Sequence, residues 1–70
     1  MKEPKTREEW QEVTDMCHFY LLLDSARQYG LVDGGPQINV KRCEQLFSKA
    51  TRLGFSPSPG SVERLTAELL

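Results

Sequence analysis

Apolar residues fall on two nearly opposite faces of the segment between Thr6 and Gly30, which contains no proline or glycine. One face carries Trp10, Val13, Cys17, Tyr20 and Leu21. The other carries Met16, Phe19, Leu23 and Ala26, with Leu22 beside it. A helix that is apolar on most sides is usually a buried helix. The pattern therefore predicts one long helix, over about residues 7–29, that other helices or another copy must cover.

Both ends of this segment carry helix-boundary signals. Thr6 and Glu9 have the spacing of a capping box, in which the Thr6 hydroxyl accepts a hydrogen bond from the Glu9 amide and the Glu9 carboxylate accepts one from the Thr6 amide. Gly30 suits the left-handed position just past a helix end. Leu31 follows it, where a Schellman motif places an apolar contact.

A connector and a second helix follow. Residues 30–39 contain Asp-Gly and Gly-Pro pairs, which mark turns, and Asn39 is a suitable N-cap. The next apolar residues recur with a period near 3.6 and predict a helix over about residues 40–53, ended by Gly54. These apolar residues are Val40, Cys43, Leu46, Phe47, Ala50 and Leu53.

A short C-terminal helix is predicted over about residues 59–69. Ser58 before Pro59 makes a favourable pair of N-cap and first helical residue, with Ser61 as a rival N-cap. The apolar side of this helix is formed by Val62, Leu65 and Leu69.

These elements predict an all-α fold, a small three-helix bundle that forms a single domain over residues 1–70. A chain this short buries only about 60% of the surface that its unfolded form exposes. Two short helices cover two sides of the long one and leave a third side open. We therefore expect the protein to form a homodimer through the long helix, with a monomeric bundle as the alternative. The candidate interaction face is formed by Phe19, Leu22, Leu23 and Ala26.

The charge is balanced overall but unevenly distributed. Nine basic and ten acidic residues give a net charge of −1, so no overall cationic field favours nucleic acid or a membrane surface. Residues 1–35 carry a net charge of −3 and residues 36–70 carry +2. This polarity suits internal pairing or self-association.

The second predicted helix has a basic outer face, formed by Lys41, Arg42, Lys49 and Arg52. Such a face is usually solvated, but it could also contact the phosphates of a nucleic acid. It could equally meet the acidic stripe of another chain, formed by Glu8, Glu12 and Asp15. The C-terminal helix offers a poor set of side chains for reading base edges, so nucleic-acid binding is kept as the alternative function.

No group of residues predicts catalysis or metal binding. Cys17 and Cys43 both fall on core-facing positions, where free cysteine acts as a small apolar residue, although a disulfide between neighbouring helices is possible. His18 lies beside Thr14 and Ser25, away from both apolar faces, and is expected to be half-exposed. Without CxxC or HxxxH spacing, or a nucleophile elbow, we expect no enzymatic activity, no cofactor and no metal.

Asp24 is a carboxylate on the same face as Cys17 and Leu21. A carboxylate at the edge of a core must be hydrogen-bonded or paired. We therefore expect Asp24 to accept hydrogen bonds from connector amides around Gly34–Gly35, or to pair with Arg42.

The sequence also predicts location and a general role. The longest apolar run, residues 19–23, is far shorter than the roughly 20 residues that a membrane span needs, and the charged N-terminus is unlike a signal peptide. Two cysteines are too few for a disulfide scaffold. We expect a cytoplasmic, non-enzymatic helical module that binds itself or another protein.

Overall fold

The long helix predicted from the sequence is α1, Arg7–Gln28, in the computed structural model, which describes residues 3–35 and 37–69. The other helices are α2, Val40–Arg52, and α3, Ser61–Leu69, and the described residues contain no strand. The all-α, three-helix prediction is therefore confirmed. None of these helices combines the length and the apolar character that crossing a lipid bilayer requires.

The N-termini of α1 and α2 are capped as the local sequence predicts, except that the Glu9 carboxylate accepts from a different backbone amide. Thr6 Oγ1 accepts a hydrogen bond from the Glu9 amide at 3.1 Å. The Glu9 carboxylate accepts from the Lys5 amide at 3.3 Å, one residue before the partner that a capping box predicts. At α2, Asn39 Oδ1 accepts from the Arg42 amide at 3.0 Å, so the predicted N-cap is confirmed.

Both α1 and α2 end in a Schellman motif, one residue before the predicted ends. After α1, Gly30 has φ = 74° and its amide donates to the Arg27 carbonyl, while the Leu31 amide donates to the Ala26 carbonyl. The same pair of bonds closes α2 around Gly54, which has φ = 95°. The Leu31 side chain stays 78% exposed, so the apolar contact that often accompanies this motif is missing.

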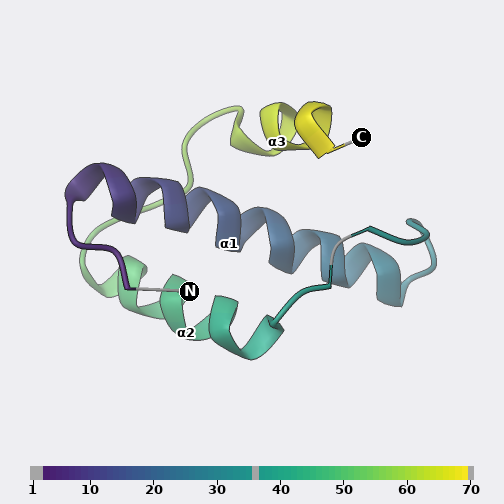
Figure 1. Ribbon diagram of the computed structural model, residues 1–70, viewed down its shortest axis with the longest axis horizontal. Helices are drawn as coiled ribbons and strands as arrows, with labels where there is room; N and C mark the ends of the chain where they lie inside the picture. Colours follow the sequence, from purple (N-terminus) through teal and green to yellow (C-terminus); the bar gives the residue numbers. More distant parts are fainter. Residues whose placement is uncertain (1–2, 36, 70) are drawn as a thin grey trace.

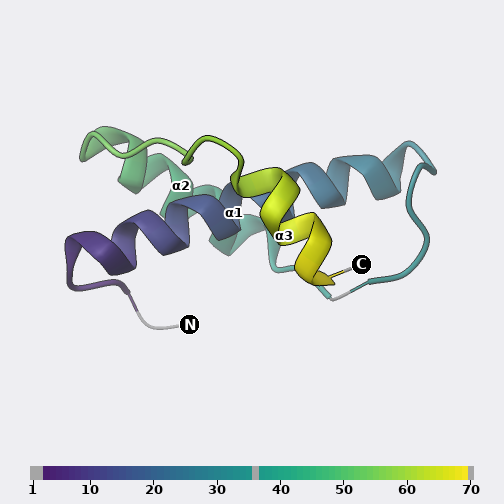
Figure 2. The ribbon, with the colours of Figure 1, turned by 90° about the horizontal axis from the view of Figure 1, so that it is seen from above.

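α1 lies in the centre, with α2 packed along one side and α3 on the opposite side (Figure 1). Seen from above, α3 crosses over the middle of α1 (Figure 2). Within residues 3–35 and 37–69, no Cα atom of α2 lies within 8 Å of one in α3. The bundle is therefore open, because α2 and α3 each pack on α1 but not on each other.

The first apolar face of α1 packs against α2. The centre of this core is formed by Cys17, Cys43 and Leu46, which are all buried. The residues packed around it are Val13, Tyr20, Leu21, Ile38 and Phe47. Trp10 continues the same face toward the N-terminus and stacks on Phe55, with ring centroids 6.3 Å apart. This interface contains most of the buried apolar residues, so it is the main source of stability.

The position predicted for His18 is wrong in one respect. Its ring stacks on Phe47 of α2, with centroids 5.9 Å apart, and its buried Nδ1 has no hydrogen-bond partner among the residues that the structure describes. The side chain as a whole is half-buried, as expected, but it lies at the edge of the α1–α2 core rather than apart from it. The reason is that α2 covers a wider arc of α1 than the apolar residues alone indicate.

The role predicted for Asp24 is also wrong. Asp24 is half-buried and accepts a hydrogen bond from Gln28 Nε2 at 2.9 Å, one turn further along α1. The connector is held instead by Arg27, whose Nε donates to the Gly34 carbonyl at 2.9 Å. Asp24 therefore satisfies its carboxylate locally and needs no partner from the connector or from Arg42.

Candidate interaction groove

The four residues predicted as an interaction face all line one apolar groove with a volume of about 250 Å³. α1 contributes Phe19, Leu22, Leu23 and Ala26. The connector contributes Val32, Asp33, Gly34 and Gly35, and α3 contributes Val62 and Thr66. We call this feature the groove. α3 crosses the middle of α1 and the connector folds back beside the end of α1 (Figures 1 and 2), and residues of all three segments line the groove.

The α1 residues of the groove differ in how much of each is available. Phe19 is 6% exposed and forms part of the floor. Leu23 and Ala26 are half-buried, while Leu22 is 46% exposed and stands at the edge. The structure thus brings the four predicted residues together, and their use in binding stays a prediction.

Two glycines and an arginine form the connector wall of the groove. The Arg27 side chain donates to the Gly34 carbonyl and lies against Gly35. A Cβ atom on Gly35 would lie 2.5 Å from Arg27 Nη2, and its φ of 101° is unfavourable for any side chain. Glycine at this position therefore lets Arg27 hold the connector close to the end of α1.

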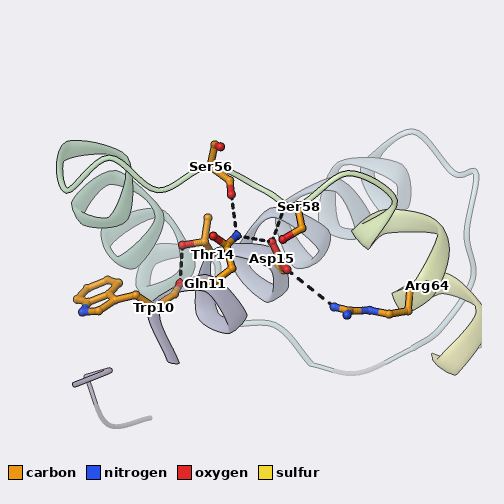
Figure 3. Close-up of polar contacts among 7 residues, drawn as sticks. All are labelled: Trp10, Gln11, Thr14, Asp15, Ser56, Ser58 and Arg64. Atoms are coloured by element: carbon orange, nitrogen blue, oxygen red, sulfur yellow. Dashed lines mark hydrogen bonds and ion pairs between the residues drawn. The ribbon is translucent and has the colours of Figure 1, made fainter. Parts of the chain in front are cut away.

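The α3 wall depends on Asp15, a carboxylate on α1 that is 4% exposed (Figure 3). It accepts hydrogen bonds from the Ser58 amide at 2.8 Å and from Gln11 Nε2 at 3.1 Å, and Arg64 of α3 lies 3.8 Å away. Gln11 also donates to the Ser56 carbonyl at 2.7 Å. These bonds hold the link between α2 and α3 against α1, and so they position the N-terminus of α3 next to α1.

α3 begins at Ser61 rather than at the predicted residue 59, because Gly60 has φ = 78°, a left-handed conformation that a right-handed helix cannot include. The Ser58 carbonyl accepts from the Ser61 amide in a turn just before the helix. The first bond of regular helical spacing runs from Arg64 to the Gly60 carbonyl. Sequence reasoning had placed Asp15 in an exposed acidic stripe. The four-residue spacing of Gln11 and Asp15, which allows a side-chain hydrogen bond, was the available signal for a polar cluster.

Three large apolar residues are exposed in this part of the chain: Leu22 lines the groove, Tyr29 caps the end of α1, and Leu31 directly precedes Val32 of the connector wall. Leu22 and Tyr29 are seven residues apart and therefore lie on the same side of α1. Tyr29 is 82% exposed, and the hydrogen bond that the Leu31 amide donates to the Ala26 carbonyl keeps Leu31 at the same end of the molecule. Sequence reasoning treated Tyr29 and Leu31 only as parts of a helix end. The other large exposed apolar residue of the described chain, Leu53, lies at the opposite end, where α2 finishes.

The four residues of the predicted basic face of α2 are not equally available, because some of them contact other parts of the chain. Lys49 pairs with Glu3 and lies 5.8 Å from the centre of the Trp10 ring. The hydrogen bond and charge of Lys49 lower the pKa of the Glu3 carboxyl. Arg42 is half-buried, whereas Lys41 and Arg52 are exposed. Nucleic-acid binding by this face stays a prediction, with fewer freely exposed cations than the sequence indicates.

The two cysteines are buried, free thiols in the centre of the α1–α2 core. Burial, together with the neighbouring Cys43, raises the pKa of the Cys17 thiol to about 12. A thiol with such a pKa is almost entirely protonated near neutral pH and is a poor nucleophile. In the part of the chain that the structure describes, no three His, Cys, Asp or Glu side chains are grouped as a metal site would require.

Comparisons with models of protein families, with curated proteins and with solved structures found no match to this chain. No relative therefore indicates what binds in the groove. The apolar lining of the groove and the exposed apolar side chains near it are the features that bear on function.

Proposed function

We propose that this protein is a small, non-enzymatic interaction module that forms a homodimer through the groove. The observation that carries the proposal is the concentration of exposed apolar side chains, Leu22, Tyr29 and Leu31, beside an unfilled apolar groove. Contiguous exposed apolar surface on a soluble domain commonly marks an interaction site.

The total surface supports a partner of appreciable size. The accessible surface is 5158 Å², whereas the scaling for compact monomers gives about 4,450 Å² for a chain of 8.0 kDa. The excess, about 700 Å² by that scaling, is close to the roughly 800 Å² that each partner contributes to a standard interface. The radius of gyration, 12.1 Å, is also above the roughly 11 Å expected for 70 residues.

A second copy of the chain is a suitable partner, because the groove and the exposed apolar side chains belong to the same patch of surface. A two-fold symmetric interface places one patch against the same patch of the partner, so a protruding group and a hollow must both occur in it. Tyr29 follows Leu22 by about 10 Å along the axis of α1. A rotation about an axis between them brings the Tyr29 ring of each copy toward the groove of the other. Both grooves are then filled at once, and the exposed apolar surface of both copies is removed from water.

Mass measurement by light scattering across a dilution series tests the proposal. We expect a mass of twice 8.0 kDa at high protein concentration and a shift toward 8.0 kDa on dilution. Leu22→Gln and Tyr29→Ser should each move the shift to higher concentration. Leu53→Gln is the matched control, because Leu53 is 55% exposed and lies outside the groove.

The outcomes are distinct. A wild-type mass that stays at that of the monomer at every concentration contradicts the proposal. A dimer that Leu53→Gln weakens as much as Leu22→Gln shows that another surface forms the interface, and it likewise contradicts the role of the groove.

A further inference from the structure

A second hollow, with a volume of about 760 Å³, lies along the N-terminal half of α1 and is bounded on one side by α3. Its apolar lining includes Val13, Met16 and Tyr20 of α1, all half-buried, and Leu65 of α3. Methionine is flexible and polarisable, so Met16 can adapt to the shape of an apolar side chain placed against it. The hollow is therefore a partly open apolar surface that is distinct from the groove, which uses the next part of α1.

The rim of this hollow is acidic. Glu8 and Glu12 line it, are both exposed, and stand one turn apart on α1. Neither takes part in an ion pair within residues 3–35 and 37–69. Like charges at this spacing repel each other on a helix, and a cationic partner would relieve that repulsion. Asp15 and Arg64 also line the hollow, but Asp15 is buried and bonded to the Ser58 amide, and the Arg64 guanidinium lies 3.8 Å from its carboxylate. Glu8 and Glu12 therefore supply the accessible negative charge, and together they exceed the single positive charge of Arg64.

The basic face of α2 in a second copy is a poor occupant. Its Lys49 is already paired with Glu3 and placed against Trp10, and its Arg42 is half-buried. Filling the hollow from that face would mean breaking contacts that the chain already makes. The complementary charge must therefore come mainly from outside this chain.

We propose that the hollow binds a basic amphipathic helix of a partner protein. The apolar side of such a helix packs on Met16 and its neighbours, while lysines or arginines beside that side face Glu8 and Glu12. Apolar anchors at helical spacing provide the affinity, and the flanking charges provide orientation and selectivity. The inference does not rest on dimer formation, because no residue lines both the hollow and the groove.

A direct binding titration tests the proposal with the full chain. The probe is a fluorescein-labelled synthetic helix of leucines and lysines at amphipathic spacing, followed by fluorescence anisotropy. We expect saturable binding that weakens as salt is added, and no binding of the same peptide with every lysine replaced by glutamate. No binding of the basic peptide, or equal binding of both peptides, overturns the proposal.

Matched charge variants locate the binding site. Glu8→Gln combined with Glu12→Gln should weaken peptide binding about fivefold, because two exposed ion pairs are lost. Glu44→Gln combined with Glu63→Gln removes the same charge from exposed positions outside the hollow and should change binding less than about twofold. Equal losses in the two pairs mean attraction to overall charge only, which contradicts a site in the hollow. The mass of each variant is also measured by light scattering. A variant that keeps the wild-type mass but binds the peptide more weakly has lost peptide binding and not self-association.

Discussion

The Asp15 carboxylate accepts a hydrogen bond from the backbone amide of Ser58 at 2.8 Å, across 43 positions of sequence. The link between α2 and α3 is held against α1 by this cluster and by the stacking of Phe55 on Trp10. The bond gives a buried charge a donor and gives an irregular segment a fixed anchor. Because α3 forms one wall of the groove, the interaction surface depends on this contact between two side-by-side segments (Figure 3).

Removal of the Asp15 carboxylate should destabilise the protein strongly. Asp15→Ala leaves the Ser58 amide without its acceptor in a part-buried site, so we expect a loss of about 2–3 kcal/mol in the free energy of unfolding, measured in urea. Asp24→Ala is the control, because the Asp24 carboxylate accepts its hydrogen bond from Gln28 of the same helix at an exposed site, and should cost about 0.5 kcal/mol or less. Similar losses in the two variants would show that Asp15 is not an anchor.

Substitution of Gly35 should loosen the connector. An alanine there would need an unfavourable φ of 101° and would force the Arg27 guanidinium away, weakening its bond to the Gly34 carbonyl. We expect Gly35→Ala to lower the free energy of unfolding by about 2–3 kcal/mol. Gly34→Ala has open space around its Cβ and should cost only about 1 kcal/mol. Thermal unfolding of both variants measures which substitution is more destabilising. A larger loss for Gly34→Ala than for Gly35→Ala would refute the prediction.

The raised pKa of Cys17 should make stability fall in alkaline solution. The folded thiol has a pKa of about 12 against an ordinary value of 9.0, so above pH 9 the unfolded chain releases a proton that the folded chain retains. The free energy of unfolding should therefore be unaffected by this thiol below pH 9 and decrease as the pH rises toward 12. Urea unfolding at a series of pH values measures the slope, and a slope of opposite sign would contradict the raised pKa.

The rate at which the thiols react is a second measure of how deeply Cys17 and Cys43 are buried. At pH 8 both cysteines should react with a disulfide reagent far more slowly than an exposed thiol, because burial blocks access to them. Cys17 is slowed further, because its raised pKa leaves little thiolate. Ser48→Cys, at an exposed position of α2, supplies the matched fast-reacting thiol. If Cys17 and Cys43 reacted as fast as Cys at position 48, the core would have to open readily.

The core between α1 and α2 should tolerate no large cavity. Leu46→Ala removes a buried side chain at the centre of this core and should cost about 2–5 kcal/mol. Domains of this size rarely have more than about 3–5 kcal/mol in total, so most of the variant should be unfolded by circular dichroism. Leu53→Ala, at an exposed site, should retain the wild-type spectrum.

Local signals in the sequence determined the helices. Thr6, Asn39, Gly30 and Gly54 act through hydrogen bonds and backbone conformations that span only a few residues, so their neighbours are sufficient to predict them. The two apolar faces of α1 likewise predicted a central helix and brought Phe19 and its neighbours to one surface. These features depend on helical periodicity, which tertiary contacts do not change.

The tertiary structure alone decided which polar residues became buried and what stood beside the groove. Asp15 and Asp24 are the same residue type on the same helix, yet of the two only Asp15 hydrogen-bonds to a segment distant in sequence. Helical periodicity gives the direction of each carboxylate around α1 but not the path of the link between α2 and α3. That path follows from the mutual fit of contacts across 43 and 45 positions, and the burial of Asp15, the start of α3 and the shape of the groove all depend on it.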